Sequence, residues 1–184
     1  MLVATMSNTA FNADLLKNLA ALRAFAISLA GNVERADDLV QETFPKALAN
    51  RTSFAEGTNL RAWLFTILRN EFYSYFRKRR REVEDARGRI ASSVGVAPAQ
   101  MGSIEFQDMR AALALLPFVQ REALLLVGAS NMSYEEAANI CGVAVGTIKS
   151  RTSRARKRLA ELMGISGTSE IGADPTIRAA LSSH

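Results

Sequence analysis

The stretch from residue 133 to residue 162 restricts what this chain can fold into more than any other part of it. Ser133 is followed three residues later by Glu136, which is the spacing of a capping box, where each side chain binds a free backbone N–H at a helix start. Gly142 is expected to end that helix, because glycine tolerates the left-handed conformation common just beyond a helix C-terminus. A second helix is then expected to start near Val145.

This second helix has one apolar stripe and one basic face. The residues expected on the buried side recur at steps of four, three and four: Ile148, Thr152, Ala155 and Leu159. The residues left pointing outward are Lys149, Ser150, Ser153, Arg154 and Lys157. Two short helices joined by a tight glycine turn, the second basic on its free face, are what a helix-turn-helix reader of the DNA major groove requires.

A helical hairpin whose basic face is merely solvated is the alternative for this stretch. Between Lys149 and Arg158 there are six Lys or Arg residues and no Asp or Glu. A solvated helix face usually carries opposite charges three or four residues apart, and this face has none. The pattern therefore favours contact with a polyanion.

Charge is unevenly distributed along the 184 residues, whose net charge is +5. The positive excess lies in residues 61–81, with seven basic and one acidic, and in residues 146–163, with six basic and one acidic. Two separated basic blocks indicate two contacts with nucleic acid. No apolar run approaches the roughly 20 residues that span a bilayer, and the first ten residues lack a signal-peptide pattern. We therefore expect a cytoplasmic protein without membrane contact.

Catalysis and metal binding find little support in the sequence. The one cysteine, Cys141, cannot form an internal disulfide, and with the single histidine, His184, it cannot build a His/Cys metal cluster. No His, Cys or carboxylate constellation at catalytic spacing is visible. We expect no enzyme activity, no catalytic residue, no metal and no cofactor.

Helical periodicity predicts an all-α protein, beginning with two helices over residues 12–30 and 34–49. The first is expected to close at Gly31 and Asn32. Pro45 should kink or break the second, because a proline in a helix interior costs about 3 kcal/mol. After a loop over residues 51–59, in which Thr58 or Asn59 can cap the next helix, the longest helix is expected over residues 60–80.

The longest predicted helix changes character along its length. Its second half interleaves aromatic with basic residues: Arg69, Phe72, Tyr73, Tyr75, Phe76 and the run Arg77–Arg81. Rings beside cations suit single-stranded nucleic acid, because bases stack on the rings while the backbone follows the charge. The alternative is that the aromatic residues fill a core, and we expect this for at least half of them, including Trp63 and Phe72.

Residues 82–105 hold glycines, serines and a proline with little periodicity. They predict a flexible linker between two small helical domains, over residues 11–81 and 106–163. In the second domain a helix from Phe106 to Leu116 should stop at Pro117, and a second helix should cover residues 118–127 before the helix-turn-helix. Residues 164–184 are expected to form a loose tail.

Three segments resemble the extracytoplasmic-function (ECF) group of the sigma-70 family: DDLVQETF at 37–44, SFAEGTNLRAWLFTILRN at 53–70 and YEEAANICGVAVGTIKSRTSRARKRL at 134–159. The combination of RAWLFTILRN with FRKRRREV and a short acidic linker is most similar to the EcfG-type general stress sigma factors of alphaproteobacteria. The resemblance covers about residues 11–163. It implies a sigma2 domain over 11–81, a sigma4 domain over 106–163, and a role in directing RNA polymerase core to stress-response promoters.

The resemblance also implies three binding surfaces. Docking on the clamp coiled coil of the largest polymerase subunit falls to Asp38, Leu39, Gln41 and Glu42, although Pro45 stands on that face where the family usually has an aliphatic residue. Capture of an unstacked base of the −10 element falls to Phe54, Asn59, Arg61, Asn70, Tyr73, Arg77 and Lys78. Contacts to base edges of the −35 element fall to Lys149, Ser150, Ser153 and Arg154. Phosphate contacts, which position the domain without specifying sequence, fall to Arg151, Arg156, Lys157 and Arg158.

The resemblance further implies a −35 element of GGAA type, a −10 element of GTT type and a small NepR-like anti-sigma protein as a partner. The alternative function is an autonomous helix-turn-helix regulator that binds duplex operators unaided. That function explains residues 106–163 but leaves the aromatic and basic helix of the first domain without a role. A helical scaffold with incidental basic patches is a third possibility, and it would show no salt-steep DNA affinity.

Overall fold

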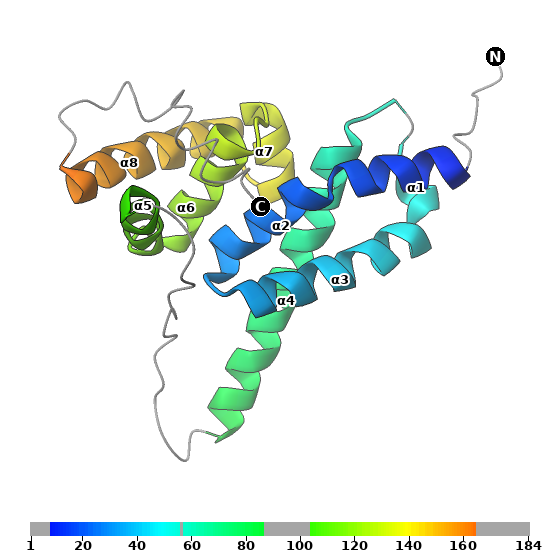
Figure 1. Ribbon diagram of the computed structural model, residues 1–184, viewed down its shortest axis with the longest axis horizontal. Helices are drawn as coiled ribbons and strands as arrows, with labels where there is room; N and C mark the ends of the chain where they lie inside the picture. Colours follow the sequence, from blue (N-terminus) through cyan, green and yellow to red (C-terminus); the bar gives the residue numbers. More distant parts are fainter. Residues whose placement is uncertain (1–7, 56, 87–103, 165–184) are drawn as a thin grey trace.

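The computed structural model describes residues 8–55, 57–86 and 104–164. Within these ranges the regular elements are helices, and there is no strand. The elements are α1 (Asn8–Lys17), α2 (Leu19–Ala30), α3 (Val33–Ala49), η1 (Arg51–Ser53), α4 (Leu60–Ala86), α5 (Ile104–Ala114), α6 (Phe118–Leu124), η2 (Leu125–Ala129), α7 (Tyr134–Cys141) and α8 (Val145–Met163). Helices α1 to α4 form one bundle and α5 to α8 a second (Figure 1). The predicted all-α fold of two helical domains is confirmed.

The first bundle packs α1, α2 and α3 around the N-terminal half of α4, while the C-terminal half of α4 extends away from both bundles (Figure 1). Its core includes Leu22, Leu39 and Phe65, which are fully buried. Phe72 is also buried, and the half-buried Trp63 packs with its ring centroid 5.4 Å from that of Phe54. The core role expected of Trp63 and Phe72 is therefore confirmed.

The stretch predicted as one helix over residues 12–30 is two helices, divided at Asn18. The Asn18 side chain donates a hydrogen bond to the Asp14 carbonyl at 2.8 Å, the acceptor that its own backbone N–H would use in an α-helix. That N–H instead donates to the Leu15 carbonyl at 3.0 Å, which tightens the turn. Apolar spacing does not report this competition between side chain and backbone. The expected end of α2 is confirmed at Gly31, where φ is 69°.

Helix α3 runs through Pro45 without interruption, so the expected break is wrong. Pro45 is exposed. One contact stabilises the helical turn before it and another the turn after it. The Thr43 hydroxyl donates to the Leu39 carbonyl at 2.7 Å, and the Lys46 ammonium pairs with Glu71 on α4. Packing against α4 therefore outweighs the local cost of the proline. Leu48 is exposed in the last turn of α3.

The helix-turn-helix forms as the sequence predicts. The Ser133 hydroxyl accepts from the Glu136 N–H at 3.0 Å, and the Glu136 carboxylate accepts from the Ser133 N–H at 2.8 Å. Gly142 ends α7 with φ at 65°. All four residues of the predicted stripe on α8 are fully buried: Ile148, Thr152, Ala155 and Leu159.

Removing the capping hydroxyl should weaken the fold measurably. Ser133→Ala leaves the Glu136 N–H without its acceptor, and losing such a cap typically costs about 1 kcal/mol. The free energy of unfolding in urea should fall by about that amount. Asn139→Ala, an exposed substitution in the same helix, is the matched control and should change it by less than about 0.5 kcal/mol. Equal effects of the two substitutions would mean that the cap does not stabilise α7.

Both ends of the segment predicted as a linker, residues 82–105, are helical. Helix α4 continues to Ala86, through a segment whose glutamates and alanine favour the helix, and α5 begins at Ile104. Residues 87–103 and the predicted tail from 165 onward lie outside the described residues. The helix expected over residues 118–127 ends at Leu124 and passes into the π-helical turn η2, in which the Ser130 N–H donates to the Leu125 carbonyl at 2.8 Å.

The two bundles are packed against each other, which the sequence did not predict. One buried cluster joins residues of the first bundle, such as Leu64, to Leu126 and Ile148 of the second. At the seam the rings of Phe72 and Phe118 stack 5.1 Å apart with an interplanar angle of 9°. The free chain is therefore closed, with the C-terminal half of α4 and the outer part of α8 at separate places on the molecule (Figure 1).

Candidate nucleic-acid and protein-binding surfaces

The outer face of α8 presents the residues expected to contact the −35 element. Lys149, Ser153, Arg154, Lys157 and Arg158 are exposed, and Ser150, Arg151 and Arg156 are half-buried. They share one face because the opposite stripe is fully buried. From residue 149 to residue 158 the face is about 14 Å long at 1.5 Å per residue, and an α-helix with its side chains, about 10–12 Å across, fits a major groove about 12 Å wide.

Contacts within the second bundle hold several of these side chains in place. The Lys149 ammonium lies 5.7 Å from the centroid of the Tyr134 ring, and the Ser150 hydroxyl donates to the Thr147 carbonyl at 3.0 Å. Arg158 pairs with Glu161, the one acidic residue of α8, at 3.0 Å. Apart from Glu161, every charged residue of α8 is therefore cationic.

The residues expected to contact the −10 element do not form one pocket. They extend along α4 from Asn59, just before its first residue, to Lys78, a span of about 28 Å at 1.5 Å per residue. Asn59, Asn70, Arg77 and Lys78 are exposed, whereas Arg61 and Tyr73 are half-buried. Asn59 caps α4, its side-chain oxygen accepting from the Ala62 N–H at 3.3 Å.

Phe54 differs from the other residues expected at the −10 element, because its side chain is buried. Its ring centroid lies 5.4 Å from that of Trp63 and 6.1 Å from that of Phe11. A ring held in this way fixes the loop before α4 and leaves no free face for a base to stack on. Its position therefore supports a packing role.

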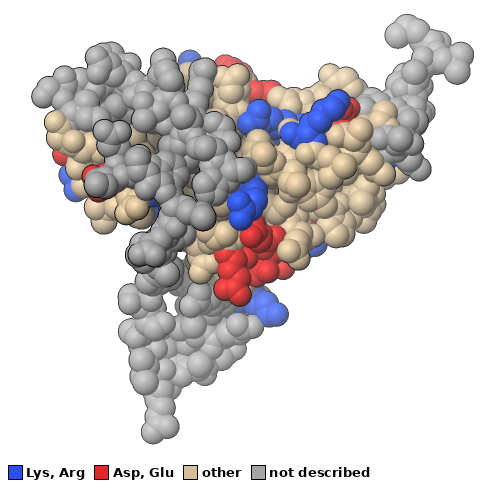
Figure 2. Space-filling model, in the orientation of Figure 1, with Lys and Arg blue, Asp and Glu red and all other residues tan. Residues whose placement is uncertain are grey.

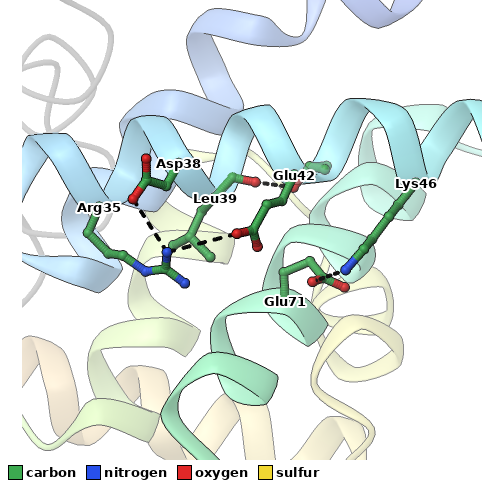
Figure 3. Close-up of polar contacts among 7 residues, drawn as sticks. Arg35, Asp38, Leu39, Glu42, Lys46 and Glu71 are labelled. Carbon is green, nitrogen blue, oxygen red and sulfur yellow. Dashed lines mark hydrogen bonds and ion pairs between the residues drawn. The ribbon is translucent and has the colours of Figure 1, made fainter. Parts of the chain in front are cut away.

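The residues expected to dock on polymerase lie on α3, where acidic side chains gather into a patch (Figure 2). Asp38, Gln41 and Glu42 are exposed, but Leu39 is fully buried and points into the core. Arg35 lies between the two carboxylates, 3.5 Å from Asp38 and 4.0 Å from Glu42 (Figure 3). The Arg35 guanidinium also stacks 3.5 Å from the centroid of the Tyr75 ring on α4. The exposed residues on this face of α3 are therefore polar. The sequence did not indicate that Arg35 pairs with two of their carboxylates.

A buried ion pair joins the two bundles. Glu122 of α6 is fully buried, and its carboxylate accepts from the Arg69 guanidinium at 2.7 and 3.4 Å and from the Tyr73 hydroxyl at 3.4 Å. The Cys141 thiol donates to the same carboxylate at 3.6 Å. Sequence reasoning missed this cluster. The signal that could have found it is Glu122 itself, the one acidic residue among the apolar side chains of residues 118–127.

Burial and the Glu122 carboxylate perturb the groups around it. They raise the pKa of the Tyr73 hydroxyl to about 12 and that of the Cys141 thiol to about 12, so both stay protonated donors. Burial alone would lower the pKa of Arg69, but the hydrogen bond and the charge of Glu122 raise it above its usual value. The cluster is thus one carboxylate surrounded by donors.

Two other predicted −10 residues also face the second bundle. The Asn59 amide donates to the Glu136 carboxylate at 2.5 Å. Arg61 lines a hollow of about 220 Å³ between α2 and η2, together with Lys17 and Ser130, and burial lowers the pKa of its guanidinium. Asn59, Arg61 and Tyr73 therefore all lie along the seam between the bundles.

Two further features bear on membranes and metals. Within the described ranges, no helix is both long enough and apolar enough to cross a membrane. The same residues hold no group of three or more His, Cys, Asp or Glu side chains placed to bind a metal ion.

Comparison with known proteins matches each bundle to a region of one protein family. The Sigma-70 region 2 family profile matches residues 15–82, and the profile of Sigma-70, region 4 matches residues 106–159. The ECF RNA polymerase sigma factor EcfG of Rhodopseudomonas palustris (strain TIE-1) is 60% identical over 168 residues, which cover 91% of this chain and 93% of that protein. The ECF RNA polymerase sigma factor SigM of Bacillus subtilis (strain 168) is 33% identical over 141 residues, 75% of this chain and 85% of that protein.

Solved structures show the same arrangement of helices. The sigma factor RpoE from Bartonella quintana, crystallised with the anti-sigma factor NepR, is 58% identical with a TM-score of 0.76, and the match covers 85% of this chain and 98% of that one. The structure of CnrH with the cytosolic domain of CnrY gives 28% identity and a TM-score of 0.63, covering 88% of this chain and 92% of that one.

Proposed function

We propose a role in transcription initiation for each surface of this chain. The premise is that the chain belongs to the ECF RNA polymerase sigma factors of the sigma-70 family. The sigma2 domain is assigned to residues 11–81 and the sigma4 domain to residues 106–163. Sigma factors as a class are transcription initiation factors and not enzymes, and polymerisation is the task of the polymerase. The observation that carries the division is the cationic face of α8 opposite its fully buried stripe.

Helix α8 enters the major groove of the −35 element, for which we propose a GGAA-type sequence. Lys149, Ser150, Ser153 and Arg154 face the base edges, and a bidentate Lys or Arg contact to guanine gives about 1–3 kcal/mol of discrimination. Arg151, Arg156, Lys157 and Arg158 hold phosphates. The exposure of Lys149, Ser153 and Arg154 supports this assignment.

Arg154→Ala should lower run-off transcription from a promoter with an intact −35 element far more than from one with that element scrambled. The lost contact is one to bases, so the expected loss on the intact promoter is roughly 5-fold to 150-fold, corresponding to 1–3 kcal/mol. Lys157→Ala removes an equal charge from the same helix and should lower both templates alike, because phosphate contacts are independent of sequence. Equal losses on both templates for Arg154→Ala would reassign Arg154 to phosphate contact or packing.

The α4 surface captures an unstacked base of the −10 element, for which we propose a GTT-type sequence. Asn59, Arg61, Asn70 and Tyr73 are the proposed base contacts, and Arg77 and Lys78 follow the strand backbone. Extracting a base costs a few kcal/mol, which contacts to the extracted base and the strand backbone offset. Phe54 supports the loop from inside, since its ring is buried against Trp63.

The acidic face of α3 docks on the clamp coiled coil of RNA polymerase through Asp38, Gln41 and Glu42. Leu39 supports that face from the core, because its side chain is fully buried. The protein is proposed to act in the cytoplasm, in response to general stress. A small NepR-like anti-sigma protein is the proposed inhibitor, supported by the 58% identity to a sigma factor that was solved with NepR.

The test is run-off transcription with purified core polymerase. We expect a transcript from a promoter with both elements when the chain is added, and none when either the chain or the core enzyme is omitted. An autonomous regulator would bind its operator without polymerase and would not start transcription with core enzyme. A core enzyme that stays inactive on this promoter in the presence of the chain would contradict the proposal.

A further inference from the structure

We propose that Arg35 is a positioning residue of the docking face on α3: stacked on the Tyr75 ring of α4, it holds the carboxylates of Asp38 and Glu42 in place for a cationic surface of the polymerase. The inference rests on the proposed docking role of Asp38 and Glu42. It adds to that role a residue that acts through the two carboxylates, and it makes α4 a support of the docking face.

Arg35 lies where it can reach both carboxylates at once. Arg35, Asp38 and Glu42 follow one another at steps of three and four residues, which places them on one side of α3. The Nη1 atom of Arg35 lies 3.5 Å from Oδ2 of Asp38 and 4.0 Å from Oε1 of Glu42 (Figure 3). The position of one guanidinium nitrogen therefore influences the positions of both carboxylates.

The Tyr75 ring holds the guanidinium from the side of α4. Its centroid lies 3.5 Å from Cζ of Arg35, a distance at which a flat guanidinium stacks well on an aromatic face. Tyr75 packs edge-on against Phe76 at 5.7 Å, and Phe76 lies 4.5 Å from the buried Phe72. The buried Nε of Arg35 has no hydrogen-bond partner among the described residues. The ring and the two carboxylates therefore determine where the guanidinium lies.

Solvent exposure distinguishes the positioning residue from the contact residues. The side chain of Arg35 is 20% exposed, whereas those of Asp38 and Glu42 are 54% and 48% exposed. A partner cation can therefore reach the carboxylates while Arg35 stays largely covered. Carboxylates that are ordered before binding lose less conformational entropy when the partner docks. Because Arg35 is itself a cation, its charge weakens the attraction of a cationic partner, so its contribution to binding is preorganisation.

Substitutions that conserve charge test this positioning. Tyr75→Leu removes the ring that holds the guanidinium, and Arg35→Lys replaces the flat guanidinium by a compact ammonium on a flexible stem. Each should raise the Kd for core polymerase roughly fivefold to tenfold, because the two carboxylates must then be ordered on binding. Tyr75→Phe keeps the ring and is the matched control, which should leave the Kd unchanged.

The kinetics separate positioning from charge and from folding. Net charge is the same in all three variants, so electrostatic steering and the association rate should not change, and the rise in Kd should come from faster dissociation. Stopped-flow anisotropy of the labelled chain with core polymerase measures both rates. Urea unfolding must show each variant as stable as the wild-type chain. Should Tyr75→Leu not fold, Arg35→Lys alone decides the test.

A double-mutant cycle tests whether Arg35 acts through the carboxylates. In an Asp38→Asn/Glu42→Gln background, Arg35→Lys should change the Kd by less than about twofold, because the groups that it positions no longer carry charge. A loss that persists in this background would show that Arg35 contacts polymerase itself and would overturn the inference. An unchanged Kd in either folded variant, or an equal loss in Tyr75→Phe, would also overturn it.

The same background separates this inference from the function on which it rests. Asp38→Asn/Glu42→Gln should by itself raise the Kd for core polymerase. If it does so while Arg35→Lys and Tyr75→Leu do not, only the positioning role of Arg35 is wrong. If the background leaves the Kd unchanged, the proposed docking face is wrong, and the inference is overturned with it.

Discussion

Glu42→Arg is expected to prevent most of the binding to core polymerase. Glu42 is exposed on α3, one turn from Asp38 (Figure 3), and an acidic surface selects a partner surface of opposite charge. Reversal replaces an attraction by a repulsion and adds a second cation near Arg35, whose guanidinium lies 4.0 Å from the Glu42 carboxylate. A loss of 2 kcal/mol or more, typical for a charge pair at an interface, corresponds to a Kd raised roughly 30-fold. Fluorescence anisotropy of the labelled chain with core enzyme measures it.

Glu34→Arg is the matched control, because it makes the same change of charge at an exposed site in the first turn of the same helix. It should alter the Kd only a few-fold. If both charge reversals raise the Kd by the same factor, and the effect depends on salt, only the total charge of the helix matters for binding. The docking site would then lie elsewhere than on the face of Asp38, Gln41 and Glu42.

Phe65→Ala is expected to remove a large part of the stability of the first bundle. Phe65 is fully buried, with its ring centroid 4.8 Å from that of Phe25. Truncating a buried phenylalanine typically costs about 3–5 kcal/mol, against a total domain stability of about 5–15 kcal/mol. Urea unfolding followed by circular dichroism should show a midpoint shifted strongly downward. Because Phe65 is on α4, which carries the proposed −10 contacts, loss of transcription should accompany the loss of fold.

Leu16→Ala removes an apolar side chain that is 66% exposed and should change the free energy of unfolding by less than about 0.5 kcal/mol. A Phe65→Ala protein as stable as Leu16→Ala would mean that Phe65 does not belong to the core of a cooperatively folding bundle. The two substitutions together therefore test the packing of the first bundle, independently of DNA or polymerase.

The helix-turn-helix could be predicted closely because local chemistry determines it. The capping box, the glycine at the turn and the spacing of the buried stripe each act over a few residues. The same stripe also predicts the exposed face of α8 by elimination. The spacing therefore predicts correctly that residues such as Arg154 are exposed.

Two features of the first bundle could not be predicted in this way. The Asn18 side chain divides the first predicted helix through a local contact that apolar spacing does not show, since it takes the backbone acceptor four residues earlier. The helix continues through Pro45 because α3 packs on α4, which is a tertiary contact. Helical spacing itself places Leu39 on the inner side of its helix, and the aromatic character of Phe54 favours burial; only the resemblance assigned the two residues to binding surfaces.

The packing of the two bundles against each other is the largest feature of the fold that the sequence does not predict. Its central contact joins Arg69 and Glu122, which lie 53 residues apart, on either side of a segment with little periodicity. No local pattern connects such residues. A glutamate in a largely apolar segment, such as Glu122 in residues 118–127, indicates that a buried partner can exist, but it does not identify the partner.

Binding of duplex promoter DNA by the purified chain, with and without core polymerase, tests most directly whether this sigma factor reads its promoter only as part of the polymerase. The account predicts that the chain alone binds weakly and with little preference for sequence. With core enzyme added, binding should become tight and should depend on both the −35 and −10 elements. Tight, sequence-specific binding by the isolated chain would contradict the account and identify an autonomous regulator.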